Sequence, residues 1–290
     1  MSNLIIGTGT ISTKLEQEFN KFDDVEVIAY RNIFTKKKIR ISNIDEIDAI
    51  YLIGINKSNL FKNVLDTVML IKYLNKQSWH GTLIFFSTQQ SLKRSFMNNL
   101  SLNNQGYYGF IKSMQNFLIK YLSNFKNFII YLPYVIDENN SWDRYFKNIA
   151  LSKKIYLPNF GENNLAICNL EQLAKFICSN NFHENSLFIY SNIISFKELL
   201  SIYSQNKQLK IFNTNISSKE KFIWNIKNSL PVYIIRIFKD LTTLNKIKVY
   251  DNENVSFKDT FRPNTEEIVN FSSSIDLNSR NINSKNINDK

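Results

Sequence analysis

The sequence is poor in the residues that build disulfide scaffolds and metal sites. Its 290 residues include only two cysteines and two histidines. Cys168 and Cys178 form no CxxC pair and have no paired histidines nearby, so neither structural zinc nor a disulfide framework is expected. A chain of this length can bury a large apolar core without such staples. We therefore predict no metal site and interpret both cysteines as small core residues.

Long apolar runs are also absent. No stretch of about 18 apolar residues occurs, so the sequence contains no candidate for a transmembrane helix. The first residues, MSNLIIGTGT, enter a strand pattern without the basic and apolar regions of a secretory signal, and a cytoplasmic protein is expected. The formal net charge of +11 favours anionic partners. Because lysine and asparagine recur along the whole chain instead of forming one basic stripe, we expect no nucleic acid among them.

Strand patterns alternate with helical patterns in the N-terminal half. Apolar segments predict five strands, at residues 4–6, 25–30, 49–55, 82–88 and 128–136. A helical pattern follows the first strand, and others separate the third, fourth and fifth. The strands are almost entirely apolar, which is typical of a parallel sheet covered by helices on both faces. The sequence therefore predicts an α/β fold with a doubly wound parallel sheet.

The pattern becomes less regular in the C-terminal half. Short strands and helices predict a smaller mixed lobe over 137–271, with some segments returning to the sheet of an N-terminal domain over 1–136. The basic, aromatic stretch at 219–248 predicts two short helices separated at Pro231. Its aromatic residues are interpreted as packing of the lobe, and contact with a membrane surface is the alternative. Residues 272–290, rich in serine and asparagine, predict a disordered tail.

Two of the seven glycines, Gly7 and Gly9, stand directly after the first strand. A glycine turn at a strand-to-helix junction lets the backbone approach a pyrophosphate, and the start of the following helix, here Thr10 and Ile11, attracts its negative charge. Ser12 occupies the position of the third glycine in the GxGxxG pattern, so the match is incomplete. The alternative is an ordinary turn that requires positive φ.

Arg31 follows the second strand, where nucleotide-binding sheets often carry an acid for the ribose of NAD or a base for the 2′-phosphate of NADP. The planar guanidinium suits a phosphate because it can donate two charge-assisted hydrogen bonds. The alternative is a solvated arginine that begins the basic loop continuing as KKK at 36–38. The first interpretation favours NADP slightly over NAD as the cofactor.

Tyr108 and Lys112 stand four residues apart in a predicted helix, so they lie on the same helix face. A neighbouring ammonium stabilises a phenolate and lowers its pKa from about 10 toward the range of a general acid or base. The fourth strand ends in Ser87 and Thr88, at the edge where open parallel sheets build their sites. A hydroxyl there can hold a substrate oxygen against the tyrosine. The alternative for the pair is a surface tyrosine beside a solvated lysine.

Several segments, in this order, resemble the extended short-chain dehydrogenase/reductase family, which includes nucleotide-sugar epimerases, dehydratases and ketoreductases. GTGTIS is similar to the family's glycine turn, AIYLIG to its third-strand motif, FFST to the strand that carries a catalytic Ser or Thr, and YYGFIK to YGxxK. FRPNTEEIV is similar to its closing Pro-x-Thr-x-Glu element. The resemblance implies a Rossmann-type sheet with a smaller substrate-binding lobe, and a homodimer.

The resemblance also implies residue roles. Tyr108 is the general acid/base, Lys112 lowers its pKa and orients the nicotinamide ribose, and Thr88 positions the reacting oxygen. The residues assigned to cofactor binding are Gly7, Gly9, Thr10, Ile11, Arg31, Gly54, Asn63, Tyr108 and Lys112.

Some positions depart from the family pattern. Gln89 and Gln90 follow Thr88 where the dehydratases resemble Thr-Asp-Glu, so elimination of water from a sugar is not expected. The segment near residue 165 lacks the arginine that many members use on a nucleotide diphosphate. Lys153 and Lys154 either replace that charge or are a solvated surface pair. These changes leave the identity of the substrate's nucleotide open.

Together with these residues, the resemblance implies an NAD(P)-dependent oxidoreductase or epimerase that acts on a nucleotide-linked sugar, by 4-keto reduction or C4 epimerisation, in surface polysaccharide biosynthesis. NADPH favours net reduction, because an epimerase returns its hydride. The alternative is a non-catalytic protein of the same fold that binds a dinucleotide as a sensor or partner subunit. Ser12 favours that alternative, whereas the presence of Thr88, Tyr108 and Lys112 together favours the enzyme.

Overall fold

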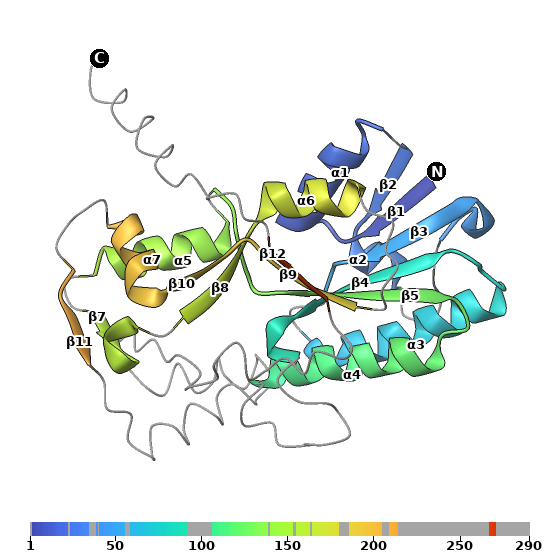
Figure 1. The fold of residues 1–290 in the computed structure, drawn as a ribbon. Helices are drawn as coiled ribbons and strands as arrows, with labels where there is room; N and C mark the ends of the chain where they lie inside the picture. The colour runs from blue at the N-terminus through green and yellow to red at the C-terminus, as the bar shows by residue number, and fades with distance from the viewer. Residues whose placement is uncertain are drawn as a thin grey trace.

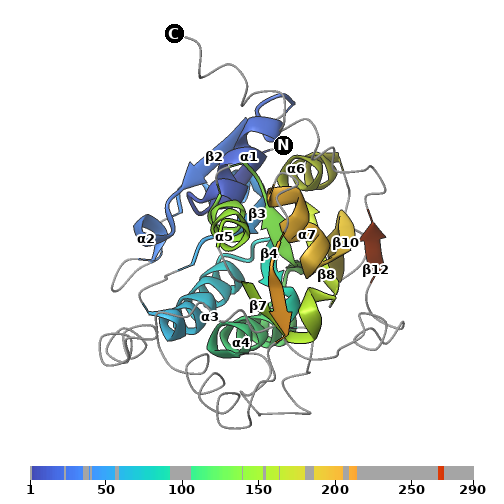
Figure 2. The ribbon, with the colours of Figure 1, turned by 90° about the vertical axis from the view of Figure 1, so that its left-hand side faces the viewer.

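The computed structural model divides the chain into a larger α/β lobe and a smaller mixed lobe (Figure 1). It describes residues 2–22, 24–34, 39, 41–55, 59–91, 106–138, 140–152, 155–162, 164–179, 186–204, 209–213 and 267–270. Seen from the side of the smaller lobe, its helices α5 (Ser141–Ala150) and α7 (Phe196–Tyr203) lie in front of the larger one (Figure 2). None of the helices in these described ranges is long and apolar enough to span a bilayer.

Seven parallel strands form the main sheet of the described residues, in the order β12–β9–β5–β4–β3–β1–β2. They are β1 (Ser2–Ile6), β2 (Asp24–Ile28), β3 (Ile47–Leu52), β4 (Thr82–Thr88), β5 (Lys126–Leu132), β9 (Ser186–Tyr190) and β12 (Glu267–Asn270). β-Branched and aromatic residues dominate them, as IDAIYL and TLIFFST illustrate, and such residues fit a pleated buried surface.

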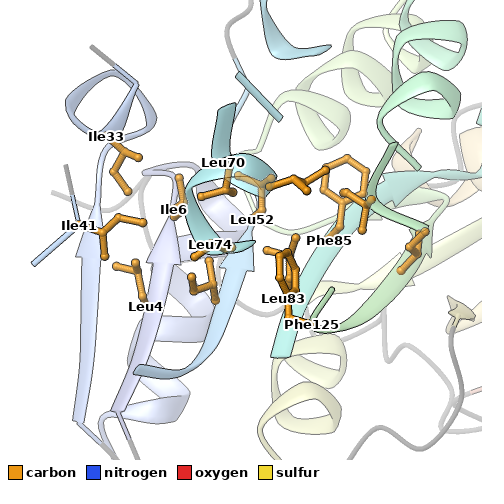
Figure 3. Packing of buried hydrophobic residues seen from close by; sticks show 14 of the residues in the cluster. Leu4, Ile6, Ile33, Ile41, Leu52, Leu70, Leu74, Leu83, Phe85 and Phe125 are labelled. Atoms are coloured by element: carbon orange, nitrogen blue, oxygen red, sulfur yellow. The ribbon is translucent and has the colours of Figure 1, made fainter. Parts of the chain in front are cut away.

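Helices cover both faces of this sheet (Figure 1). α1 (Thr10–Phe19) and α6 (Leu170–Ser179) lie on one face, and α3 (Leu60–Lys76) and α4 (Gly106–Leu122) lie on the other. Alternate residues of a strand enter opposite apolar layers. Leu4 and Leu52 pack with Leu70 of α3 (Figure 3), whereas Ile5 and Tyr51 pack on the α1 side. The predicted doubly wound α/β fold is therefore confirmed.

The smaller lobe contains a mixed sheet and a separate apolar core. Its sheet has the order β10–β8–β6, with β10 antiparallel and β6 parallel to β8. The remaining elements are β6 (Tyr134–Ile136), β7 (Ile155–Leu157), η3 (Pro158–Gly161), β8 (Asn164–Asn169), β10 (Asn192–Ser195) and β11 (Ile211–Asn213). Phe146 of α5 and Leu199 of α7 are fully buried in the core between them. The smaller mixed lobe expected from the sequence is present.

Chain segments differ from the sequence prediction in two places. The predicted strand at 128–136 is divided at Pro133: β5 ends before it, and β6 after it joins the smaller sheet. Proline has no N–H for a sheet hydrogen bond, which makes it a natural point for the chain to leave the sheet. Tyr30, predicted as the end of the second strand, instead begins the four-residue helix α2 (Tyr30–Ile33). The helices predicted at 219–248 and the tail at 272–290 lie outside the described residues.

The strand order reverses around β1, which lies between β2 and β3. At such a switch point the chain leaves two neighbouring strands in opposite directions and opens a crevice at their carboxyl ends. The backbone N–H groups of Ile53 and Gly54, after β3, both donate to the carbonyl of Ile6 at the end of β1, at 3.1 and 2.7 Å. The two strand ends are thus fixed to each other beside the crevice.

Candidate active site

A cleft of about 340 Å³ opens at this crevice, between the main sheet and the smaller lobe. One end is lined by Gly9, Thr10 and Ile11 at the start of α1. Its middle is lined by Thr88 at the end of β4 and by residues of the first turns of α4, and its far end by residues of β6 and α5. The cleft therefore joins the predicted phosphate-binding turn to the predicted catalytic residues.

The β1–α1 turn has the geometry of a phosphate-binding turn. Gly7 has a φ of +142°, which residues with a side chain rarely adopt, and a Cβ there would lie 2.7 Å from the backbone nitrogen of Gly54. Gly9 has no atom within 4 Å of the place where its Cβ would be. No side chain caps the start of α1, so its first backbone N–H groups are available to an anion. The turn therefore fits the pyrophosphate of a dinucleotide.

Ser12, which replaces the third glycine, is fully buried in α1. Its hydroxyl oxygen has no hydrogen-bond partner, and it would lie 3.1 Å from a Cβ at Gly7. The helix therefore packs on the turn closely enough to enclose the serine side chain. The glycine turn keeps its conformation despite the substitution, at the cost of an unsatisfied hydroxyl.

Thr88, Tyr108 and Lys112 all line the cleft. Tyr108 is half-buried near the start of α4, and Lys112, one turn further along, is only 2% exposed. The Lys112 ammonium donates to the carbonyl oxygen of Phe86 at 2.8 Å and lies 4.3 Å from the centroid of the Phe85 ring. The ring face and the carbonyl both attract a cation. The solvated-lysine alternative for Lys112 is therefore wrong.

Burial shifts the pKa of both members of the pair. Burial lowers the pKa of Lys112 to about 7 and raises the pKa of Tyr108 to about 12. The second shift is opposite to the lowering that we expected from a neighbouring ammonium. The reason is desolvation, which disfavours the phenolate and the ammonium alike. Tyr108 is therefore protonated at neutral pH, and Lys112 loses its proton far more easily than a lysine in water.

The pH dependence of stability should reveal the buried lysine. The pKa of Lys112 is about 7 in the folded chain against 10.5 ordinarily, so between these values the unfolded chain binds the extra proton and the free energy of unfolding rises with pH. We expect this rise to be steeper than in Lys112→Met, by up to about 1.4 kcal/mol per pH unit. Urea unfolding of both proteins between about pH 7 and pH 9 measures this rise. If the free energy of unfolding changes equally with pH in the parent and in Lys112→Met, Lys112 stays charged in the folded chain.

The smaller lobe contributes residues that the sequence prediction missed. Tyr134, Asn140 and Trp142 line the far end of the cleft. The Asn140 side chain donates to the carbonyl of Val135 and accepts from the N–H of Asp143, both at 2.8 Å, so it fixes the start of α5 to β6. The Trp142 ring is 38% exposed and meets Tyr134 edge-on at 4.6 Å. An asparagine before the amphipathic WDRYF pattern was the signal for this helix start.

Four predicted cofactor residues do not line the cleft; Gly7 shapes the turn, and the other three are Arg31, Gly54 and Asn63. Arg31 is exposed on α2, beyond the end of β2. Gly54 packs against the turn instead, because a Cβ there would lie 2.9 Å from the Cα of Gly7. Asn63 is 1% exposed, donates to the carbonyl of Leu60, and accepts through its own carbonyl from Gln115 of α4. The backbone of Asn63 therefore contacts α4, and the assignment of its side chain to the cofactor stays a prediction.

Tyr30, next to Arg31, turns inward. Its hydroxyl donates to Asp66 of α3 at 3.1 Å, and burial raises its pKa. The cysteines behave as predicted for small core residues: Cys168 is fully buried, and burial raises its pKa to about 12, which makes it a poor nucleophile. The described residues include no cluster of three potential metal ligands. Lys153 and Lys154 lie outside the described residues.

No protein-family model and no curated protein sequence matches the chain. Solved structures do match. The dTDP-4-dehydrorhamnose reductase of Clostridium acetobutylicum is 10% identical, with a TM-score of 0.55, over 74% of this chain and 84% of that one. The Bacillus anthracis dTDP-4-dehydrorhamnose reductase, in complex with NADP, is 14% identical, with a TM-score of 0.54, over 76% and 85%. The UDP-glucose 4-epimerase of Thermotoga maritima, with UDP-glucose, is 10% identical, with a TM-score of 0.50, over 74% and 86%.

At these identities the similarity establishes the fold. The chain has the fold of the extended short-chain dehydrogenases/reductases, as the sequence resemblance predicted. The reductases and the epimerase share this fold, so the fold by itself does not select between their reactions.

Proposed function

We propose that the chain is an NAD(P)-dependent oxidoreductase that reduces the 4-keto group of a nucleotide-linked sugar. The observation that carries this proposal is the single cleft that joins an uncapped helix start to Thr88, Tyr108 and Lys112. A dinucleotide-binding module needs the first feature alone, whereas an enzyme needs both. Similar folds occur in a reductase that was solved with NADP and in an epimerase that was solved with UDP-glucose.

The residues of the cleft can move a proton and hold the reacting oxygen. When bound, the nicotinamide supplies the hydride, which is chemistry that protein side chains lack. Tyr108 donates its phenolic proton to the carbonyl oxygen as the carbon is reduced, and Thr88 holds that oxygen in place. Lys112, when protonated, stabilises the phenolate that remains. The backbone N–H groups at the start of α1 hold the pyrophosphate.

Reduction suits the protonation state of Tyr108 better than C4 epimerisation does. Burial raises its pKa to about 12, so the group carries the proton that reduction requires at neutral pH. Epimerisation begins with removal of a proton from the sugar hydroxyl, for which Tyr108 would first have to ionise. The alternative function, a sensor or partner subunit without catalysis, is favoured by one observation, the buried Ser12 hydroxyl in the glycine turn.

The substrate end of the cleft supports a sugar as the ligand. Trp142 and Tyr134 present aromatic surface beside neutral polar groups of Asn140 and Ser141. A pyranose has apolar C–H faces and a rim of hydroxyls, which match this combination of ring faces and hydrogen-bonding groups. We place the activity in the cytoplasm, in the biosynthesis of a surface polysaccharide; accumulation of the keto sugar in a deletion strain tests that role.

We also propose that two copies associate through α3 and α4. Phe61 and Leu65 of α3 and Tyr121 and Leu122 of α4 expose large apolar side chains. The pairs lie toward opposite ends of the two helices, since Leu122 is hydrogen-bonded to Asn75 near the end of α3, so an interface along α3 and α4 would cover both. A monomer mass in sedimentation equilibrium at micromolar concentration would contradict this proposal.

Arg31→Ala tests the cofactor assignment. If the exposed guanidinium binds the 2′-phosphate of NADPH, its removal should weaken NADPH binding by about 10- to 100-fold, since charge-assisted hydrogen bonds contribute about 1.5–3 kcal/mol. NADH has no such phosphate, so its affinity should change by less than about twofold. Titration followed by nicotinamide fluorescence measures both.

Lys126→Ala is the matched control, because Lys126 is exposed at the opposite end of the sheet, where β5 begins. It removes one positive charge without touching the cleft, so both affinities should remain those of the parent. Equal weakening of NADPH and NADH binding by Arg31→Ala would contradict the 2′-phosphate assignment. Binding of neither cofactor by the folded parent protein would contradict the enzyme proposal itself.

A further inference from the structure

Ser91 joins the two elements that carry the proposed catalytic residues. It is the last residue of the 3₁₀ helix η2 (Gln89–Ser91), which directly follows Thr88, and it is 6% exposed. Its hydroxyl donates to the carbonyl oxygen of Thr88 at 2.6 Å. On the other side it accepts from the Asn116 amide at 3.2 Å, and its own carbonyl accepts from the Ser113 hydroxyl at 3.3 Å. Both partners are buried on α4, the helix of Tyr108 and Lys112.

The hydroxyl of Ser91 has no bonding capacity left. A serine hydroxyl has one proton and two acceptor lone pairs. The short bond to the Thr88 carbonyl uses the proton, so both remaining contacts must be accepted by Ser91. The Asn116 amide nitrogen supplies one donor, and the Ser87 hydroxyl, 2.9 Å away, must supply the other. This orientation also explains why the Asn116 side-chain oxygen is left buried without a partner.

The direction of these bonds has a consequence for the cleft. Ser87 and Thr88 both line it. Because the Ser87 proton is directed to Ser91, Ser87 can offer a ligand only an acceptor. Of the two hydroxyl groups at the end of β4, we therefore assign that of Thr88, and not that of Ser87, to a substrate carbonyl oxygen.

We propose that Ser91 is a positioning residue that fixes Thr88 relative to Tyr108 and Lys112. It acts through the Thr88 carbonyl on one side and through Asn116 and Ser113 of α4 on the other. The catalytic part of this proposal rests on the proposed function, because it needs Thr88 and Tyr108 to act on one oxygen. The structural part does not, and it can be tested without a substrate.

Ser91→Ala removes the bond to Thr88 while leaving the cleft lining intact. We expect kcat to fall by about 10- to 100-fold, which is the effect of a misplacement on the order of 1 Å, and KM and the affinity for NADPH to stay within about twofold. Ser91→Thr keeps the hydroxyl and should retain most of kcat. Ser113→Ala removes only the longest bond and should reduce kcat in the same direction but by less.

Ser123→Ala is the matched control. Ser123 follows α4 at the end away from Tyr108, is half-buried, and its hydroxyl likewise donates to a backbone carbonyl, that of Ile119, at 2.6 Å. Ser123→Ala should lower the unfolding temperature without lowering kcat. An effect of Ser91→Ala on the unfolding temperature alone, as in Ser123→Ala, would overturn the proposal. If Ser91→Ala does not fold, the kcat of Ser113→Ala tests the proposal instead. A reduced kcat in Ser113→Ala supports the proposal, and an unchanged kcat overturns it.

The methyl resonance of Thr88, in protein labelled with ¹³C-methyl threonine, gives a readout that does not depend on activity. Ser91→Ala should shift this resonance and lower its order parameter. Thr13 should be unaffected, because it lies on α1 and its hydroxyl donates to the Gly9 carbonyl at 3.3 Å. An unchanged Thr88 resonance would overturn the proposal. If the parent protein reduces no keto sugar, the proposed function fails, and the Thr88 resonance alone decides the role of Ser91.

Discussion

Tyr108→Phe is expected to lower kcat by about 10²- to 10⁴-fold while the affinity for NADPH stays within about twofold. Phenylalanine fills the same volume at the start of α4, so the cleft keeps its shape, but it has no proton to donate. The pKa of Tyr108, about 12, means that the parent protein holds that proton throughout the neutral range. Single-turnover oxidation of bound NADPH, with a panel of nucleotide-linked 4-keto sugars, measures the loss.

Tyr121→Phe provides the control for this experiment. Tyr121 lies on the same helix, more than three turns further along, and is 63% exposed. It should keep the parent rate, since Tyr121 does not line the cleft and phenylalanine keeps the apolar ring at the proposed α3–α4 interface. Turnover by Tyr108→Phe at the parent rate would remove Tyr108 from the mechanism and favour the non-catalytic function.

Gly7→Ala should lower the stability of the protein, whereas Gly9→Ala should leave the stability unchanged and weaken cofactor binding. Gly7→Ala is expected to lower the free energy of unfolding by roughly 2–4 kcal/mol, because its φ of +142° is strained for alanine and the new Cβ would lie 2.7 Å from the Gly54 nitrogen. Gly9 has an extended backbone, and a Cβ there meets no atom within 4 Å. Gly9→Ala should therefore unfold at the parent temperature.

The same Gly9→Ala protein should bind NADPH at least about tenfold more weakly, because its methyl group would occupy the space through which a pyrophosphate approaches the backbone. The pair separates two uses of glycine in one turn: Gly7 for the turn itself, Gly9 for the ligand. Thermal unfolding and a fluorescence titration on both variants test this. NADPH affinity unchanged by Gly9→Ala would place the pyrophosphate somewhere other than the start of α1.

The main sheet and the middle of the cleft could be predicted because their signals are local. Apolar strands between helical patterns indicate a parallel sheet, and the carboxyl ends of its strands must share one edge. This reasoning placed Gly9 and Thr88 in one cleft. The spacing of Tyr108 and Lys112 within one helix added a second local constraint. These four residues line the cleft of the folded chain.

Other features depend on contacts between distant segments and were missed. Trp142 reaches the cleft only because the chain leaves the main sheet at Pro133 and the smaller lobe folds back over the strand ends. The backbone carbonyl of Asn63 accepts from Gln115 of α4, a contact between helices that the sequence did not reveal. The raised pKa of Tyr108 reflects how much water the folded chain excludes, which spacing along a helix does not reveal.

Hydride transfer from NADPH to a nucleotide-linked 4-keto sugar tests the central claim most directly. The purified protein is mixed with NADPH and then with the sugar, and the nicotinamide absorbance is followed through one turnover, with Tyr108→Phe in parallel. The account predicts loss of the absorbance at a rate that Tyr108→Phe reduces by orders of magnitude. A protein that binds NADPH but leaves it unoxidised with every keto sugar of the panel would contradict the account and support a binding function.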